Sequence, residues 1–89
     1  AENRPPGVAR SGASEDALIV GHRLMAAGED ELALRAYLRA AAEEGINADT
    51  LSAIGSANLA LGRLGQAERM LRRALEIEPG FVPALNNLG

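Results

Sequence analysis

The sequence has no cysteine, no lysine and no tryptophan, and Tyr37 and Phe81 are its one tyrosine and one phenylalanine. The absence of cysteine excludes disulfides, thiol catalysis and thiolate metal sites. With so few aromatic side chains, a core must be built from Leu, Ile and Ala, which favour closely packed helices. All nine basic residues are Arg and the formal net charge is -3, so the chain has no strongly basic field for nucleic acid.

Long apolar segments are missing as well. No stretch approaches the ~18–20 apolar residues that cross a membrane, so we expect no membrane span. No signal peptide is visible, but the chain begins without Met, which leaves open a targeting segment upstream. Residues 1–13 combine Pro, Gly and Ser without apolar periodicity, which predicts a linker or tail.

The rest of the chain repeats with a period of 34 residues, which is the spacing of a helical repeat protein. The matched pairs are Gly21 and Gly55, Gly28 and Gly62, Ala33 and Ala67, Tyr37 and Leu71, and Ala40 and Ala74. Within each period, apolar residues recur every three to four positions, as on one face of a helix. This pattern predicts helices over about 15–27, 30–44, 49–61 and 65–78, and a fifth that begins near residue 83.

Residue types at the predicted helix ends support these boundaries. The signals are Ser14 and Asn47 as N-caps, Gly28 and Gly62 as left-handed residues after helix ends, Pro79 as a stop, and Pro83 in a first turn. Exposed ion pairs are predicted along the helices, namely Glu31–Arg35, Arg39–Glu43, Glu68–Arg72 and Arg72–Glu76.

Gly21 and Gly55 lie inside helices, where each costs ~1 kcal/mol relative to Ala. We therefore predict that a second backbone approaches them.

Together these positions resemble the tetratricopeptide repeat (TPR) family over residues 14–89. The resemblance is carried in the second repeat by Leu51, Ile54, Gly55, Gly62, Ala67, Leu71, Ala74 and Pro79, and in the first by Val20, Gly21, Gly28, Ala33, Tyr37 and Ala40. The sequence departs from the family at Gly45, where proline is usual, at Ala17, where a large residue is usual, and at Asn58, where Tyr is common. We expect the buried Asn58 amide to pair with a backbone carbonyl.

The resemblance implies an all-α, right-handed superhelical solenoid of antiparallel helix pairs. Residues 14–47 and 48–81 would be two full repeats, and residues 82–89 would start a third with its first helix. Because solenoid repeats are stabilised by their neighbours, we interpret the chain as a piece of a longer protein, or as one whose remainder is disordered. We also expect self-association through the open ends, where Leu85 and Leu88 would be uncovered.

The resemblance also implies a concave groove that binds a segment of a partner protein. The residues that it assigns to this groove are Leu18, His22, Met25, Ser52, Ser56, Leu59 and Asn86, with Asn87 as a further candidate. A partly apolar groove suits an amphipathic helix or an extended segment. The alternative is that Leu18, Met25 and Leu59 pack between repeats, and that the two Asn residues only follow the family pattern. The TPR subtype that clamps chaperone tails uses Lys side chains to do so. This sequence has no Lys, so we do not expect it to clamp a chaperone tail.

Neither catalysis nor metal binding is expected. The residue types of a hydrolase triad are present at His22, Asp49, Ser52 and Ser56, but no nucleophile elbow or oxyanion-hole motif accompanies them. One histidine without cysteine supplies no metal ligand set. Residues 29–31 are acidic but lack the alternating spacing of a calcium loop. We therefore expect no cofactor and no enzyme activity.

Three functional hypotheses follow. The first is a scaffold or adaptor for other proteins. Within it, residues 20–29 and 31–40 resemble the TPR proteins of bacterial tight-adherence (Flp-type) pilus assembly, which implies a periplasmic or outer-membrane-anchored location. The second is a cytoplasmic TPR adaptor or co-chaperone-like regulator. The third is a set of accessory repeats in a larger enzyme, such as a glycosyltransferase.

Overall fold

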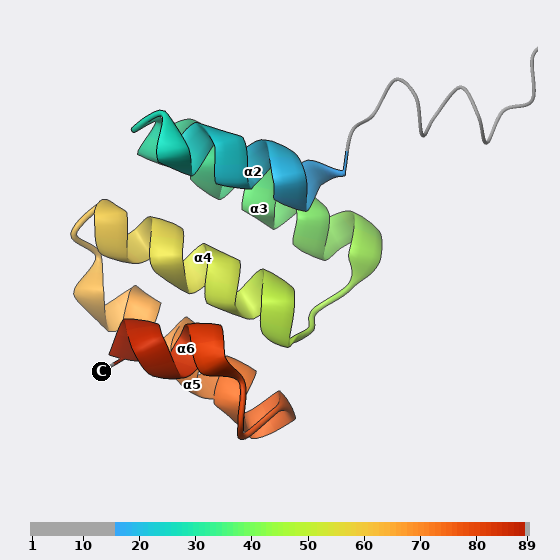
Figure 1. Cartoon of the computed structure of the whole chain (residues 1–89), viewed down its shortest axis with the longest axis vertical. Helices are drawn as coiled ribbons and strands as arrows, with labels where there is room; N and C mark the ends of the chain where they lie inside the picture. Colours follow the sequence, from blue (N-terminus) through green and yellow to red (C-terminus); the bar gives the residue numbers. More distant parts are fainter. Residues whose placement is uncertain (1–15, 89) are drawn as a thin grey trace, which may run out of the picture.

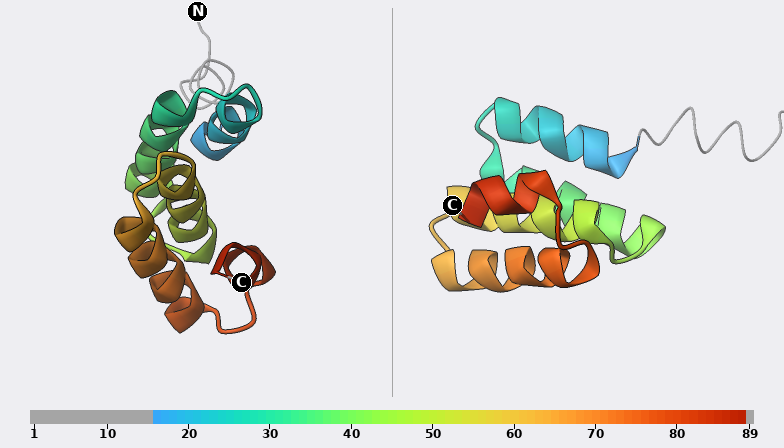
Figure 2. Two further views of the ribbon diagram at one scale, coloured as in Figure 1. Left: turned by 90° about the vertical axis from the view of Figure 1, so that its left-hand side faces the viewer. Right: turned by 60° about the horizontal axis from the view of Figure 1, so that its bottom comes forward.

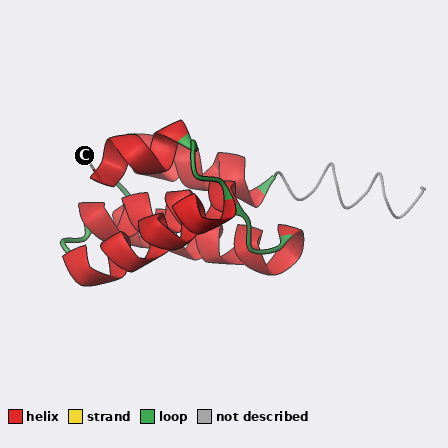
Figure 3. Cartoon of the chain, turned by 90° about the horizontal axis from the view of Figure 1, so that it is seen from below, coloured by secondary structure: helices red, strands yellow, loops and turns green. Residues whose placement is uncertain are grey.

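The computed structural model describes residues 16–88, which form five helices and no strand (Figures 1 and 3). The helices are α2 (Ala17–Ala26), α3 (Asp30–Glu44), α4 (Ala48–Ala60), α5 (Leu64–Ile77) and α6 (Val82–Leu88). The all-α prediction and the predicted helices are confirmed, and Pro83 lies in the first turn of α6 as expected. The predicted linker over residues 1–13 lies outside the described residues. None of the described helices is long and apolar enough to cross a membrane.

The helices lie in two layers. Each helix packs against the next one along the chain, and α4 also contacts both α2 and α6. In Figure 2, α3 and α5 lie on one side of the molecule, while α2, α4 and α6 lie on the other. Because α2 and α6 both contact α4, these three helices form one continuous face.

Side-chain caps begin two of the helices. Asp16 caps α2, because its Oδ1 accepts a hydrogen bond from the Leu18 N–H at 3.0 Å. The sequence predicted Ser14 as the cap, and this residue lies outside the described residues. In the structure the N-cap of α2 is Asp16. Asn47 caps α4 as predicted: its Oδ1 accepts from the Thr50 N–H at 2.9 Å, and the Thr50 Oγ1 accepts from the Asn47 N–H at 3.0 Å. This reciprocal capping box pairs two otherwise unsatisfied donors.

Glycines with positive φ follow three helices. Gly28 and Gly62 have φ of 81° and 80°, which confirms the predicted left-handed ends. Gly45, which follows α3, has φ of 101°. Proline cannot adopt that angle, because its ring holds φ near −65°. A proline at this position would therefore not fit the observed backbone.

The glycines inside α2 and α4 make room mainly for side chains. A Cβ added at Gly21 would overlap the Tyr37 ring, and one added at Gly55 would lie 2.7 Å from Leu71 Cγ. The prediction of an approaching backbone is thus wrong at Gly21, because a bulky side chain from the next helix fills the space. At Gly55 the Ala67 carbonyl oxygen is also close, at 3.3 Å from the added Cβ.

The core consists of two apolar clusters that share α4. One cluster joins α3 to α4 through Ala33, Leu34, Tyr37, Ala41, Ala53, Ile54 and Ala57. The other joins α4 to α5 and α6 through Ala48, Leu51, Leu71, Ala74 and Ala84. Nine of the 13 residues of α4 are buried, so this helix is the centre of the molecule. Buried Asn58 donates from Nδ2 to the Ile54 carbonyl at 2.9 Å, as predicted, while its Oδ1 has no partner among the described residues.

The exposed ion pairs follow the prediction only in part. Arg39–Glu43 and Arg72–Glu68 form at 2.9 and 2.6 Å. Glu31 pairs with Arg63 at 3.1 Å, between the starts of α3 and α5, and not with a residue of its own helix. The predicted pairs of Glu31 with Arg35 and of Arg72 with Glu76 are therefore wrong for the described chain. Such exposed pairs contribute little to stability, at about 0–1 kcal/mol each.

Candidate functional site

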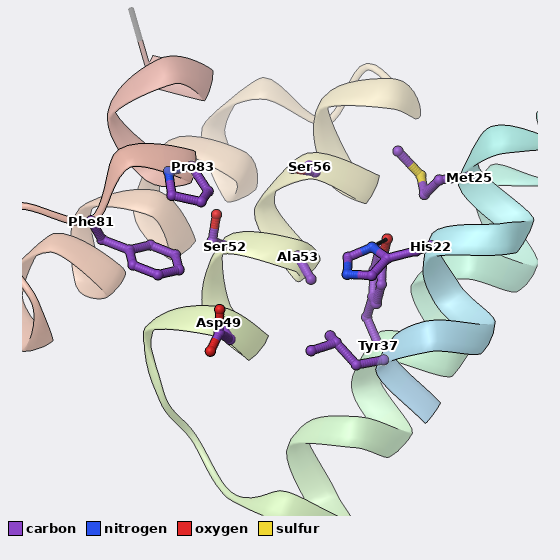
Figure 4. Close-up of a pocket in the computed structure, with 10 residues that line it drawn as sticks. His22, Met25, Tyr37, Asp49, Ser52, Ala53, Ser56, Phe81 and Pro83 are labelled. Carbon is purple, nitrogen blue, oxygen red and sulfur yellow. Dashed lines mark hydrogen bonds between the residues drawn. The ribbon is translucent and has the colours of Figure 1, made fainter. Parts of the chain in front are cut away.

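A hollow of about 320 Å³ opens on the face that α2, α4 and α6 share (Figure 4). It is lined by Leu18, His22 and Met25 of α2, Tyr37 of α3, Asp49, Ser52, Ala53 and Ser56 of α4, and Phe81 and Pro83 at the start of α6. This volume lies at the lower end of the ~300–1,000 Å³ that small-molecule sites occupy. The hollow has room for a few side chains of a bound segment.

The structure brings five of the seven predicted groove residues to this hollow. They are Leu18, His22, Met25, Ser52 and Ser56. Leu59 is half-buried and lines a second hollow with Asn87 and Leu88, between α4, α5 and α6. Asn86 is exposed on α6 and lines neither of the two hollows. The predicted groove is thus divided, because α6 packs alongside α4, with its start near Ser52 and its end near Ser56 and Leu59.

A histidine–tyrosine pair forms one wall of the hollow. His22 Nδ1 lies 2.8 Å from the Tyr37 hydroxyl, and the two rings meet edge to face with centroids 5.3 Å apart. Tyr37 is buried, and this burial raises the pKa of its phenol. The phenol is therefore neutral at neutral pH, and its hydroxyl forms a hydrogen bond with the imidazole of His22, while the tyrosine ring packs in the core.

The other polar side chains come from α4. Ser52 is buried, and half-buried Ser56 accepts a hydrogen bond on its Oγ from Asn87 Nδ2 at 2.6 Å. Asn87 was a candidate to hold the backbone of a ligand, but in this structure it ties α6 to α4. This bond helps to place Phe81 and Pro83 at the edge of the hollow.

Acidic residues gather at one end of the hollow. Asp49 lines it, and Asp16 caps the helix that carries Leu18. The pKa of nearby Glu44 is raised, first by a side-chain hydrogen bond to Asp16, then by partial desolvation and by the charges of Asp16, Glu43 and Asp49. Carboxylates from three helix ends therefore act on one another here. No Arg is among the residues that line the hollow.

The arrangement contains no assembled catalytic or metal centre among residues 16–88. His22 pairs with Tyr37 and not with a serine or Asp49. No group of three potential metal ligands is present in the described part of the chain. What the site offers is an apolar surface with hydroxyls and one acidic end.

The sequence analysis gave no site role to four of the residues that line the hollow. Tyr37 was named only as part of the repeat pattern and Ala53 was not singled out, although each borders the hollow. Phe81 lies just before α6, and Pro83 lies in the first turn of α6. The spacing of apolar residues does not indicate which way side chains point at such a turn. The one available signal was that Phe81 is the only phenylalanine of the chain.

No family model matches the chain, and neither a curated protein nor a solved structure matches it. The fold and the site by themselves define an all-α protein of repeat-like organisation with one mixed hollow on a shared helical face.

Proposed function

We propose that this chain is a TPR-type module of stacked helix pairs that binds a segment of a partner protein in the hollow between α2, α4 and α6. The observation that carries the proposal is that Leu18, His22 and Met25 from the first repeat line one hollow with Ser52 and Ser56 from the second. The resemblance to the TPR family implies a common groove for the same residues.

The equivalence of the two repeats supports the TPR part of the proposal. Tyr37 occupies the space beside Gly21, and Leu71 occupies the space beside Gly55. Both pairs are separated by 16 residues, and they are displaced from one another by 34. The same contact between a glycine and a bulky residue thus occurs at the same place in both helix pairs, as a solenoid of like units requires.

The chemistry of the hollow supports binding without catalysis. Its apolar side chains offer area to bury, and its few polar groups can orient a segment. The one histidine is held by Tyr37 at 2.8 Å, so no base is directed at a serine. We therefore propose a scaffold or adaptor, and no enzyme activity.

The wider role would be distinguished by what, if anything, precedes or follows this sequence. A lipidated cysteine upstream would favour the pilus-assembly hypothesis, and the absence of an export signal would favour the cytoplasmic adaptor. A catalytic domain downstream would favour accessory repeats of an enzyme. In all three hypotheses the chain binds a segment of another protein, as we propose here.

The test is an affinity capture from native extract with three proteins side by side. They are the wild type, a Leu18→Glu/Met25→Glu double variant, and an Ile77→Glu control at an exposed position outside the hollow. Each captured protein is then titrated against all three by calorimetry, after circular dichroism has shown equal helicity. We expect binding by the wild type and the control, and loss with the double variant. Partners that bind the double variant as well as the wild type would show that the hollow is not the site.

A further inference from the structure

The hollow has two chemically different sides. Leu18, Met25 and Ala53 supply an apolar surface. Phe81 and Asp49 supply an aromatic ring and a carboxylate, and Figure 4 shows both across the hollow from His22 and Met25. A single bound side chain cannot match both surfaces, whereas two neighbouring side chains of a peptide can.

The acidic side is larger than Asp49 alone. Asp16 and Glu44 lie at adjoining helix ends, and the raised pKa of Glu44 reflects its hydrogen bond to Asp16 and the field of Asp49. Glu43 adds to this field but is paired with Arg39 at 2.9 Å. The positive ends of the α2 and α4 dipoles offset part of the negative charge, while the C-terminal end of α3 adds to it. The result is an anionic end that a cationic side chain complements.

The aromatic ring of Phe81 favours one type of cationic side chain over the other. A guanidinium group stacks on an aromatic face and pairs with a carboxylate at the same time, because it is planar and carries five donors. An ammonium group is a compact and strongly hydrated charge that suits this combination less well. Half-buried Phe81 and Asp49, which lie on the same side of the hollow in Figure 4, therefore favour arginine.

We propose that the bound segment carries an arginine next to an apolar side chain, with the guanidinium against Asp49 and Phe81 and the apolar group against Leu18 and Met25. This inference rests on the proposed function, since it names the chemistry of the segment that the hollow binds. A volume of about 320 Å³ accommodates a small number of side chains, so recognition is confined to a short motif.

The test begins with random twelve-residue peptides displayed on phage and selected against the intact chain. Peptides that also bind the Leu18→Glu/Met25→Glu variant are removed. One selected peptide and its version with Arg replaced by Gln are then titrated by fluorescence polarisation. The proteins are the wild type, Asp49→Asn, Phe81→Leu and the control Glu76→Gln, which removes the same charge outside the hollow.

We expect the selected peptides to share an arginine beside an apolar residue. Replacing that Arg should weaken binding to the wild type about fivefold, as for a partly exposed ion pair. On Asp49→Asn the same replacement should cost less than about twofold, because the partner charge is already gone. Phe81→Leu should weaken the Arg peptide about two- to threefold, and Glu76→Gln should change nothing. Circular dichroism of each variant checks that its helices are intact.

Each contrary outcome has a distinct meaning. Hollow-dependent peptides without Arg, with acidic residues or with a sequence from this chain would overturn the arginine inference and leave the proposed function standing. The inference also fails if the Arg replacement costs the same on Asp49→Asn as on the wild type. If no selected peptide depends on Leu18 and Met25, the proposed function is wrong and the inference fails with it.

Discussion

At the scale of single residues, Tyr37 connects the core to the candidate site. Its side chain is only 2% exposed. The ring occupies the space beside Gly21, and the hydroxyl lies 2.8 Å from His22 Nδ1 at the wall of the hollow. Any change in the packing of α2 on α3 is therefore expected to move His22 as well.

Gly21→Ala should destabilise the protein by about 1–3 kcal/mol, although alanine is the better helix former, because the new methyl group would overlap the Tyr37 ring. Gly65→Ala is the matched control, since a Cβ there meets nothing within 4 Å. It should stabilise the protein by up to about 1 kcal/mol through helix propensity. Urea denaturation measures both. A Gly21→Ala variant as stable as Gly65→Ala would contradict the packing described here.

Glu44→Gln should stabilise the protein at neutral pH. The pKa of Glu44 is raised above its ordinary value of 4.5, chiefly by the hydrogen bond to Asp16. Its protonated form thus stabilises the fold fully below pH 4.5, and this contribution is lost as the pH rises through the raised pKa. Thermal melts should therefore show a higher Tm for Glu44→Gln than for the wild type at pH 7, and equal values near pH 3.5.

The Tm difference should shrink in high salt, because salt screens the repulsion between Glu44 and the other solvent-exposed carboxylates. Glu76→Gln, which removes a charge from the exposed surface of α5, is the control for net charge. The same Tm gain from Glu76→Gln at pH 7, or a gain from Glu44→Gln that persists at pH 3.5, would argue against an acidic cluster at this end of the hollow.

At the scale of elements, α4 decides the architecture. It contributes to both core clusters and carries Asp49, Ser52 and Ser56 into the hollow. Its start is the best-defined helix end in the described chain, since Asn47 and Thr50 cap one another and Thr50 Oγ1 also donates to the Gly45 carbonyl at 3.1 Å. A weakened cap should therefore affect the whole fold.

Asn47→Ala should lower the free energy of unfolding by about 0.5–2 kcal/mol, because it leaves the Thr50 N–H without its acceptor. Asn47→Ser keeps an acceptor oxygen without adding a charge close to Glu44 and Asp49, so it should retain most of the stability. Chemical denaturation followed by circular dichroism measures both variants. Equal losses of stability in the two variants would mean that the acceptor oxygen of residue 47 does not stabilise the start of α4.

At the scale of the whole molecule, the two clusters should unfold together. Leu51 is 1% exposed in the second cluster, and the first cluster shares the same helix. Leu51→Ala should therefore cost about 2–5 kcal/mol, while Leu85→Ala at a 46% exposed position should stay within about 0.5 kcal/mol. Tyr37 fluorescence reports the first cluster and circular dichroism reports all helices. The two transitions should coincide in every variant, and separate transitions would show that α4 does not couple the repeats.

Periodicity was sufficient to predict every described helix to within about two residues, because each buried stripe in this chain repeats at helical spacing. The resemblance to the TPR family, and not periodicity, indicated five of the residues that line the hollow. It did not separate Leu59 and Asn86 from the others. That division depends on how α6 packs against α4, and no local pattern encodes this packing.

Local chemistry thus determined the helices, the positive-φ glycines and the Asn47 cap, because each depends on residues within a few positions of one another. Tertiary structure decided the pairing of Glu31 with Arg63, the contact of Tyr37 with Gly21 and His22, and the placement of Phe81 and Asp49 in one hollow. These contacts join residues from different helices or from a turn. Their geometry is set by how the helices pack, which the order of residues along the chain does not by itself reveal.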